Sequence, residues 1–149
     1  MKFSTRVRYG LRALLELARE GQDLPVPLAR LAEKQNLSVK YLENLFHALR
    51  DAGIVAASRG PRGGYRLARP AGEITVLEIA QALDGRVRLV ECVGNPRFCD
   101  QAAHCRTHPL WEELSRVLEE HMARITLAQL AAQDPGLSDA CGAGPGGDE

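Results

Sequence analysis

The apolar positions of the first fifty residues recur at helical spacing in three successive segments. In STRVRYGLRALLELARE, residues 4–20, they fall along one side of a helix at Val7, Leu11, Leu14, Leu15 and Ala18. A second helix is expected in LARLAEKQN, because Pro25 and Pro27 mark its start and proline is tolerated only in a first turn. The third segment, LSVKYLENLFHALRDAG, has Ser38 as its N-cap and an expected buried stripe at Leu42, Leu45, Phe46 and Leu49.

The polar positions of this third segment indicate a helix that faces a partner. Only a short Asn-Leu-Ser turn separates it from the second helix. Two helices joined by such a turn, the second polar on its outer face, form a helix-turn-helix candidate. The outer face opposite the apolar stripe carries Lys40, Glu43, Asn44, His47 and Arg50.

A basic hairpin is expected directly after these helices. The strand-like runs IVAASRG and GYRLARP are joined by glycines that permit a tight turn, and Arg59, Arg62 and Arg66 place positive charge around it. Such a hairpin is a wing, suited to phosphates or to a minor groove. Residues 1–70 therefore predict a winged helix-turn-helix domain that binds double-stranded DNA, with a protein-interaction domain of similar build as the alternative. The candidate DNA-binding residues are Ser38, Lys40, Tyr41, Glu43, Asn44, Arg59, Arg62, Gly63 and Gly64.

The second half of the chain predicts a short helix, a loop and a long helix. ITVLEIAQALDG is the short helix, and residues 71–108 as a whole are expected to form a linking helix and a cysteine loop. Residues 109–133, PLWEELSRVLEEHMARITLAQLAAQ, read as one helix of about twice the typical length. Its apolar stripe fits a dimerisation helix between subunits that read paired half-sites, or else a helix lying on its own domain. The Gly-rich residues 134–149, with Cys141, are expected to be a disordered tail.

Charge divides the chain at the same place. Residues 1–70 hold 13 of the 19 Lys and Arg but only 6 of the 19 Asp and Glu, so a net charge of zero conceals a basic half and an acidic half. This division favours a nucleic-acid-facing N-terminal half. Neither a signal peptide nor a membrane-spanning apolar run is evident, so the sequence predicts a cytoplasmic protein without membrane contact.

Three of the four cysteines fall in one loop before the long helix, ECVGNPRFCDQAAHCRTHPLW. These are Cys92, Cys99 and Cys105, and two residues separate Cys105 from His108. A disulfide framework is disfavoured in a cytosolic chain, which leaves metal ligands or a redox or catalytic group. Thiolates suit iron–sulfur clusters and zinc alike, and the close C-x₂₋₄-C pair that zinc sites usually show is absent. A thiol enzyme with Cys105 as nucleophile and His108 as base is possible chemistry, but it leaves the basic wing unexplained.

Taken together, these segments resemble the winged-helix regulators of the IscR, NsrR and CymR type. The stretches that carry the resemblance cover about residues 1–132: RYGLRALLELA, LSVKYLENLFHALRDAGIV, SRGPRGGYRL, ITVLEIAQALDG, the cysteine loop, and LWEELSRVLEEHMARITLAQL. The resemblance implies a homodimeric DNA-binding transcription regulator, not an enzyme, with no small-molecule substrate. It also implies that Glu43 helps to distinguish classes of operator.

The same resemblance implies an iron–sulfur cluster, [2Fe–2S] in the first place and [4Fe–4S] as the alternative. The positions that match the ligands of IscR-like members are Cys92, Cys99, Cys105 and His108. NsrR-like members take an acidic ligand from the N-terminal helix of the partner instead, and the matching residue is Arg8, which cannot bind a metal. One departure is that six residues separate Cys92 from Cys99, where IscR-like loops usually have five.

Overall fold

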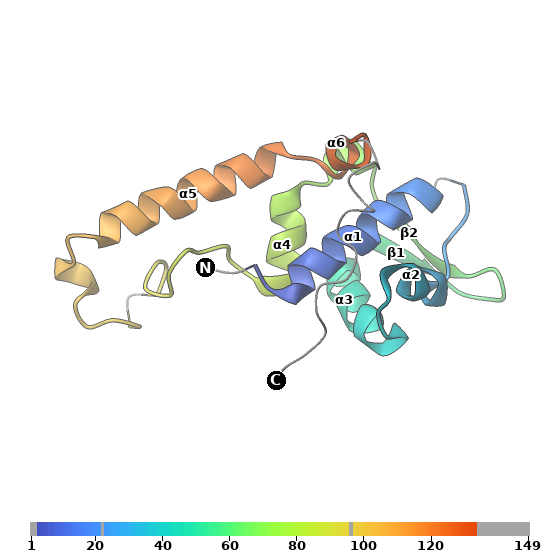
Figure 1. The fold of residues 1–149 in the computed structure, drawn as a ribbon, viewed down its shortest axis with the longest axis horizontal. Helices are drawn as coiled ribbons and strands as arrows, with labels where there is room; N and C mark the ends of the chain where they lie inside the picture. Colours follow the sequence, from blue (N-terminus) through green and yellow to red (C-terminus); the bar gives the residue numbers. More distant parts are fainter. Residues whose placement is uncertain (1–2, 22, 96, 134–149) are drawn as a thin grey trace.

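The computed structural model describes residues 3–21, 23–95 and 97–133 of the chain. Helices dominate it, and one antiparallel hairpin follows the third of them, which confirms the predicted fold of a mainly α protein with a small β-hairpin wing (Figure 1). The predicted tail at 134–149, with Cys141, lies outside the described residues. The elements are α1 (Thr5–Glu20), α2 (Leu28–Gln35), α3 (Val39–Asp51), β1 (Val55–Ser58), β2 (Gly64–Leu67), a 3₁₀ turn (Ala71–Glu73), α4 (Val76–Asp84), a second 3₁₀ turn (Ala102–His104), α5 (His108–Arg124) and α6 (Leu127–Ala131).

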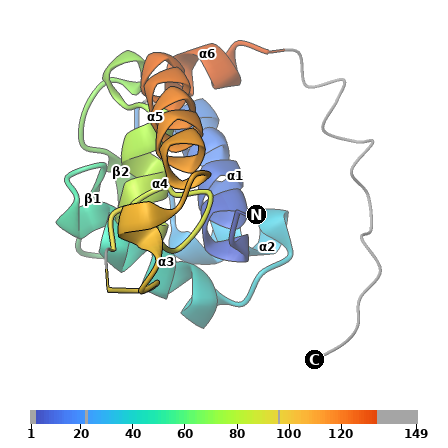
Figure 2. The same ribbon diagram turned by 90° about the vertical axis from the view of Figure 1, so that its left-hand side faces the viewer.

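The molecule consists of a winged-helix body and an arm, which we define as residues 85–124. The cysteine loop runs outward along α5 and joins it at the far end, while the hairpin lies at the opposite end of the long axis (Figure 1). Viewed along that axis, α5 lies in front of α4 and α1 (Figure 2). The loop that carries the thiols is therefore remote from the hairpin that is predicted to touch DNA.

Burial confirms the apolar stripe of α3 but not all of that predicted for α1. Every residue of the α3 stripe is buried. In α1, Val7 and Leu14 of the predicted stripe are buried, whereas Leu11, Leu15 and Ala18 are only half-buried. The other buried positions of this helix are Gly10, Ala13 and Leu17. The difference arises because α1 packs against α2, α3, α4 and α6, so its core is not a single stripe. A Cβ at Gly10 would come within 2.4 Å of the Leu83 side chain, which shows how closely α1 and α4 cross.

The hairpin is attached to the body at two points. Val26, between α1 and α2, pairs with Tyr65 of β2 through two backbone hydrogen bonds of 2.8 Å. The Tyr65 ring also meets Phe46 of α3 edge to face, with ring centroids 4.9 Å apart. Aromatic pairs in this arrangement are favourable beyond their buried area. The wing and α3 are thus held in one orientation by contacts that no local pattern in the sequence reveals.

The expectation of one continuous helix over 109–133 is wrong. Helix α5 ends at Arg124, and α6 begins at Leu127. Between them the backbone is extended and pairs with the segment before α4, where the Val76 amide donates to the Ile125 carbonyl at 2.9 Å and the Leu127 amide to the Ile74 carbonyl at 2.8 Å. Thr126 then caps α6 in a capping box with Gln129. The physical reason is that these tertiary hydrogen bonds replace helical ones and anchor the inner end of α5 to the body.

Replacing Gly64 by alanine is expected to lower the free energy of unfolding by about 1–3 kcal/mol. A Cβ at this position would lie 2.4 Å from the Val26 carbonyl oxygen, so the bridge between the hairpin and the α1–α2 connection must open. Urea unfolding followed by circular dichroism measures the change. Gly72→Ala is the matched control, because a Cβ there has no neighbour within 4 Å. Equal unfolding midpoints for the two variants would contradict this account.

Candidate DNA interface and cysteine loop

The start of α3 is built by local hydrogen bonds. Asn36 ends α2 in the left-handed conformation at φ 53°, which turns the chain sharply toward α3. The Ser38 hydroxyl then accepts a hydrogen bond from the Tyr41 amide at 3.1 Å, as expected of an N-cap. Ser38 is therefore already engaged in capping the helix, so any contribution to DNA contact comes in addition to that role.

The exposed face of α3 carries the predicted polar residues. Lys40 and Asn44 are exposed, and Glu43 is partly so. The Lys40 ammonium lies 3.7 Å from a Glu43 carboxylate oxygen, and the Lys40 side chain is 80% exposed. Such an exposed pair contributes little to stability, so both side chains stay available to a partner.

Two further residues at this end of α3 have surroundings that the sequence did not show. Tyr41 is half-buried, its ring meets Tyr9 of α1 edge to face, and its hydroxyl donates to the Thr5 hydroxyl at 3.5 Å, so it ties α3 to α1. Val39, the first residue of α3, is 47% exposed although it is apolar. The only signal in the sequence was that Val39 falls outside the buried stripe. An apolar side chain there can contact a thymine methyl group.

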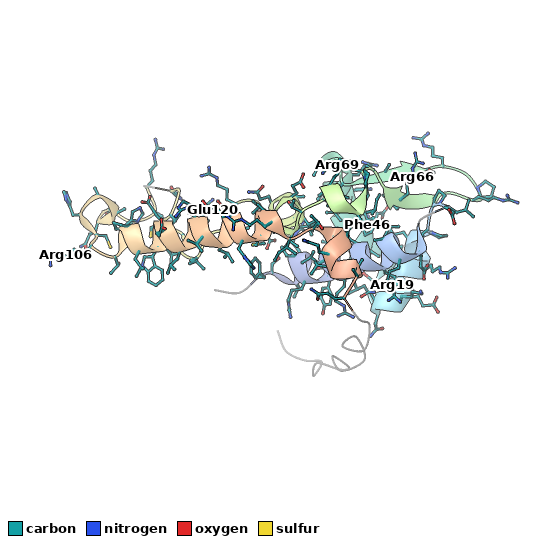
Figure 3. The ribbon with its side chains drawn as sticks, turned by 90° about the horizontal axis from the view of Figure 1, so that it is seen from above. Arg19, Phe46, Arg66, Arg69, Arg106 and Glu120 are labelled. Carbon is teal, nitrogen blue, oxygen red and sulfur yellow. The ribbon has the colours of Figure 1, made fainter. Side chains whose placement is uncertain are left out.

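The turn of the wing places arginines outward and uses its glycines for backbone geometry. Arg59, Arg62 and Arg66 are exposed, and Figure 3 labels Arg66 on the wing. A Cβ at Gly63 would lie 2.4 Å from the Ser58 carbonyl oxygen, so this close approach requires glycine. Gly63 and Gly64 therefore shape the wing, while the arginines supply its charge.

Two arginines join α4, and hence the base of the arm, to the body. Arg69 donates to the Glu78 carboxylate at 2.9 Å and to the Glu73 carbonyl at 3.2 Å (Figure 3). Arg6 of α1 donates to the Leu83 carbonyl at 2.9 Å, at the end of α4. Hydrogen bonds from the Thr75 backbone, followed by those from Arg69, hold the pKa of Glu78 below its ordinary value. Both ends of α4 are thus fixed to the winged-helix body.

The three loop cysteines are free thiols and are half-buried. The Cys105 sulfur lies 3.2 Å from the Thr107 hydroxyl, and hydrogen bonds from Thr107 hold the pKa of the Cys105 thiol below its ordinary value. Arg106, beside Cys105, lies at the far end of the arm (Figure 3). The lowered pKa favours the thiolate, which is the form that binds metals and reacts with oxidants.

His108, the first residue of α5, has its two ring nitrogens in different surroundings. Nε2 lies 3.2 Å from the Glu112 carboxylate, whereas Nδ1 is buried and has no hydrogen-bond partner among the described residues. The backbone joins His108 to Cys105, since its amide donates to the Cys105 carbonyl at 3.3 Å. Across residues 3–21, 23–95 and 97–133, no three His, Cys, Asp or Glu side chains converge closely enough to hold a metal ion. Three of the predicted ligands thus lie on the loop and the fourth begins α5, and the four are not gathered in this conformation.

Helix α5 has two apolar faces rather than one broad stripe. Ser115 and Met122 are buried, and the Ser115 hydroxyl accepts a hydrogen bond from the Leu89 amide at 3.2 Å, so this face packs on its own chain. On another face, large apolar side chains are open to solvent at i, i+4 and i+7: Leu110 is 51% exposed, Leu114 40% and Val117 47%. Residues 3–21, 23–95 and 97–133 thus leave this second face largely uncovered.

The acidic and basic residues of α5 form a network along its outer surface. Arg116 pairs with both Glu113 and Glu120, the second of which is labelled in Figure 3. These contacts hold the pKa of Glu113 below its ordinary value and the pKa of Arg116 above its ordinary value. No helix in the described part of the chain is long and apolar enough to cross a membrane.

The fold combines a helix-turn-helix, whose second helix has an exposed polar face, with a basic wing anchored beside it and a remote thiol loop. This combination is typical of a winged-helix transcription regulator. The sequence profile of the Rrf2 family, described as an iron-dependent transcriptional regulator, matches residues 3–133. The chain belongs to this family.

Named relatives and solved structures agree with the family assignment. The HTH-type transcriptional regulator IscR of Photobacterium profundum is 42% identical over 130 residues, which are 87% of this chain and 75% of the relative. The structure of CymR, the global cysteine regulator of B. subtilis, superposes with a TM-score of 0.73 at 34% identity, covering 90% of this chain and 98% of CymR. IscR of T. potens superposes with a TM-score of 0.70 at 34% identity, covering 98% of this chain and 94% of that protein. The Photobacterium relative is named a transcriptional regulator, and CymR is named a regulator.

Proposed function

We propose that this protein is a homodimeric transcription regulator that senses iron–sulfur cluster status, redox state or nitric oxide through its cysteine loop. The observation that carries the proposal is the loop itself. Three free thiols lie on the loop, and a histidine whose buried Nδ1 has no partner among the described residues begins the helix that follows it, whose apolar face is exposed. The similarity to IscR proteins and the family's description as iron-dependent support the same reading.

Double-stranded DNA is the partner that the body fits. The proposed interface consists of the exposed face of α3 in a major groove and the wing arginines on phosphates or in a minor groove. Phe46 and Tyr65 keep these two surfaces in one orientation, so they can engage the duplex together. Arg59 and Arg62 supply charge, while Lys40, Glu43 and Asn44 reach base edges or the backbone.

Replacing Glu43 by alanine is expected to widen the choice of DNA sequence with little loss of affinity. The major-groove donor that best fits a carboxylate is the amino group of cytosine, so the variant loses a base contact. It also loses a repulsion between the carboxylate and the phosphates, which offsets the cost. Selection from a random DNA pool with each protein measures the change.

The matched control for this experiment is Asp51→Ala, which removes a 77% exposed carboxylate from the last turn of the same helix. Asp51 lies at the opposite end of α3 from Glu43, so its variant is expected to select the wild-type motif. A motif that is unchanged in the Glu43 variant would rule out a discriminating role for this residue. Failure of the wild-type protein to enrich any sequence would overturn the DNA-binding proposal itself.

The donors of the loop fit an iron–sulfur cluster chemically. Thiolates are the usual ligands of such clusters, and one imidazole in place of a thiolate raises the potential, as in Rieske centres. The proposed ligands are Cys92, Cys99, Cys105 and His108, with [2Fe–2S] preferred over [4Fe–4S]. When bound, the cluster would supply a one-electron couple. Because the ligands are not gathered in the described conformation, binding requires the loop to fold around the cluster.

A structural zinc ion or a thiol-only redox switch at the same loop is the alternative. The contact between Cys105 and Thr107, which favours the thiolate, is the observation that supports a thiol switch. A zinc site is colourless, whereas a cluster absorbs in the visible through charge transfer. A visible spectrum of the anaerobically purified protein therefore distinguishes an iron–sulfur cluster from a zinc site.

The partner proposed for the exposed face of α5 is a second copy of the chain. A two-fold dimer buries the same patch from both subunits and sets two recognition helices against paired half-sites. Since the inner end of α5 is fixed to the body at Thr126 and its outer end carries the cysteine loop, a change in the loop can alter how two such helices meet. This gives the cluster a route to the DNA-binding surface.

A further inference from the structure

The two ring nitrogens of His108 have different surroundings, since one has a carboxylate neighbour and the other has no partner among the described residues. The His108 side chain is 18% exposed, with Nε2 at 3.2 Å from Glu112 Oε1 and Nδ1 buried without a partner in the described chain. An ionised carboxylate can only accept a hydrogen bond. In the neutral imidazole that binds metals, the proton therefore belongs on Nε2, facing Glu112, and the lone pair is on Nδ1.

We propose that Glu112 is a positioning residue that fixes this tautomer, so that Nδ1 of His108 is the atom that binds the metal. The inference deepens the proposed function and rests on it. A buried nitrogen lone pair without a hydrogen-bond donor is unfavourable, and a metal ion supplies the missing partner. The pattern is a carboxylate–histidine–metal arrangement, in which the carboxylate sets the ring orientation and raises the basicity of the ligand.

Glu112 is distinguished from its neighbours by its partner. It lies one turn after His108 on α5, an i,i+4 spacing that brings two side chains together. Glu113 and Glu120, on the same helix, are both held by Arg116. Glu113 is therefore a close control, because its removal changes the same charge one residue away without touching His108.

A more basic imidazole stabilises the oxidised, more positive state of the metal site. Loss of the Glu112 charge should therefore make the cluster easier to reduce and raise its midpoint potential. Glu112→Gln keeps an acceptor oxygen but removes the charge, and Glu112→Leu removes both. The midpoint potential is expected to be lowest in the wild type, higher in Glu112→Gln and highest in Glu112→Leu. Glu113→Gln is expected to have the wild-type potential.

The ligating nitrogen is tested directly by pulsed electron paramagnetic resonance of the reduced full-length protein. The protein is made with histidine labelled with ¹⁵N at either δ1 or ε2 alone. Strong coupling to ¹⁵Nδ1 is expected, and strong coupling to ¹⁵Nε2 would overturn the inference while leaving the cluster proposal intact. A wild-type protein that takes up no cluster under anaerobic reconstitution would overturn both.

The role of Glu112 is tested by redox titration of the same cluster in the four proteins. An upward shift in Glu112→Gln with none in Glu113→Gln supports the positioning role. Equal potentials in all of them, or equal shifts in both glutamine variants, would overturn it. Should the leucine variant fail to fold, the comparison between the two glutamine variants decides, since each replaces a carboxylate by an amide of the same shape.

Discussion

Replacing Cys99 by alanine is expected to remove the iron–sulfur cluster almost completely. Even residues behind the metal ligands cost about 10–100-fold in metal affinity when they are replaced, so loss of a thiolate ligand should cost at least as much. Cys99 lies on the loop between Cys92 and Cys105, and all three thiols are free. Iron and sulfide analysis of the anaerobically purified variant, together with its visible spectrum, measures the loss.

Cys141→Ala is the matched control, because it removes a thiol that lies outside the loop sequence, residues 91–111. It is expected to keep the wild-type iron and sulfide content. Full retention of the cluster in the Cys99 variant, or an equal loss in the Cys141 variant, would contradict the proposed ligand set. Stoichiometric zinc with no visible absorption in the wild-type protein would favour the structural zinc alternative instead.

Replacing Leu114 by glutamate is expected to give a monomer that binds a two-half-site DNA about 10²–10⁴-fold more weakly. Leu114 is the central residue of the exposed apolar face, between Leu110 and Val117. In the proposed dimer a glutamate there would bury an unpaired charge, which is costly. The loss in DNA affinity follows because the second half-site is no longer bound by a linked subunit. Light scattering at micromolar concentration measures the mass, and fluorescence anisotropy measures the affinity.

Leu24→Glu provides the control for this variant. Leu24 is 70% exposed and lies between α1 and α2, on the body rather than the arm, so its variant is expected to remain a dimer. Affinity for a single half-site should be nearly the same in both variants, because neither touches α3 or the wing. A dimeric Leu114 variant, or a wild-type monomer with intact affinity for the paired site, would rule out α5 as the proposed dimer contact.

Much of the candidate DNA interface could be predicted because its signals are local. Ser38 caps α3 through an atom three residues away, and the stripe from Leu42 to Leu49 is a periodic pattern within one helix. The hairpin needs only two short strands and the glycines between them. The break at Thr126 also had a local signal, the capping box with Gln129, but the strong helical periodicity around it concealed that signal.

Features that depend on distant contacts could not be predicted. The buried face of α1 depends on four other helices, and the place where α5 ends depends on hydrogen bonds to the segment before α4. The spacing of His108 and Glu112 is visible in the sequence, yet only burial shows that one ring nitrogen has a partner and the other has none.

By itself, the sequence determined the first three helices, the turn between α2 and α3 and the basic wing, because these depend on neighbours within one or two turns of chain. It also offered the candidate ligands, through the resemblance to a known family. Only the tertiary structure decided that Phe46 and Tyr65 lock the wing to α3, that α5 is anchored at one end, and that one of its apolar faces is left open. The physical reason is that burial and long-range hydrogen bonds depend on which segments pack together, and periodicity in one segment does not specify its neighbours.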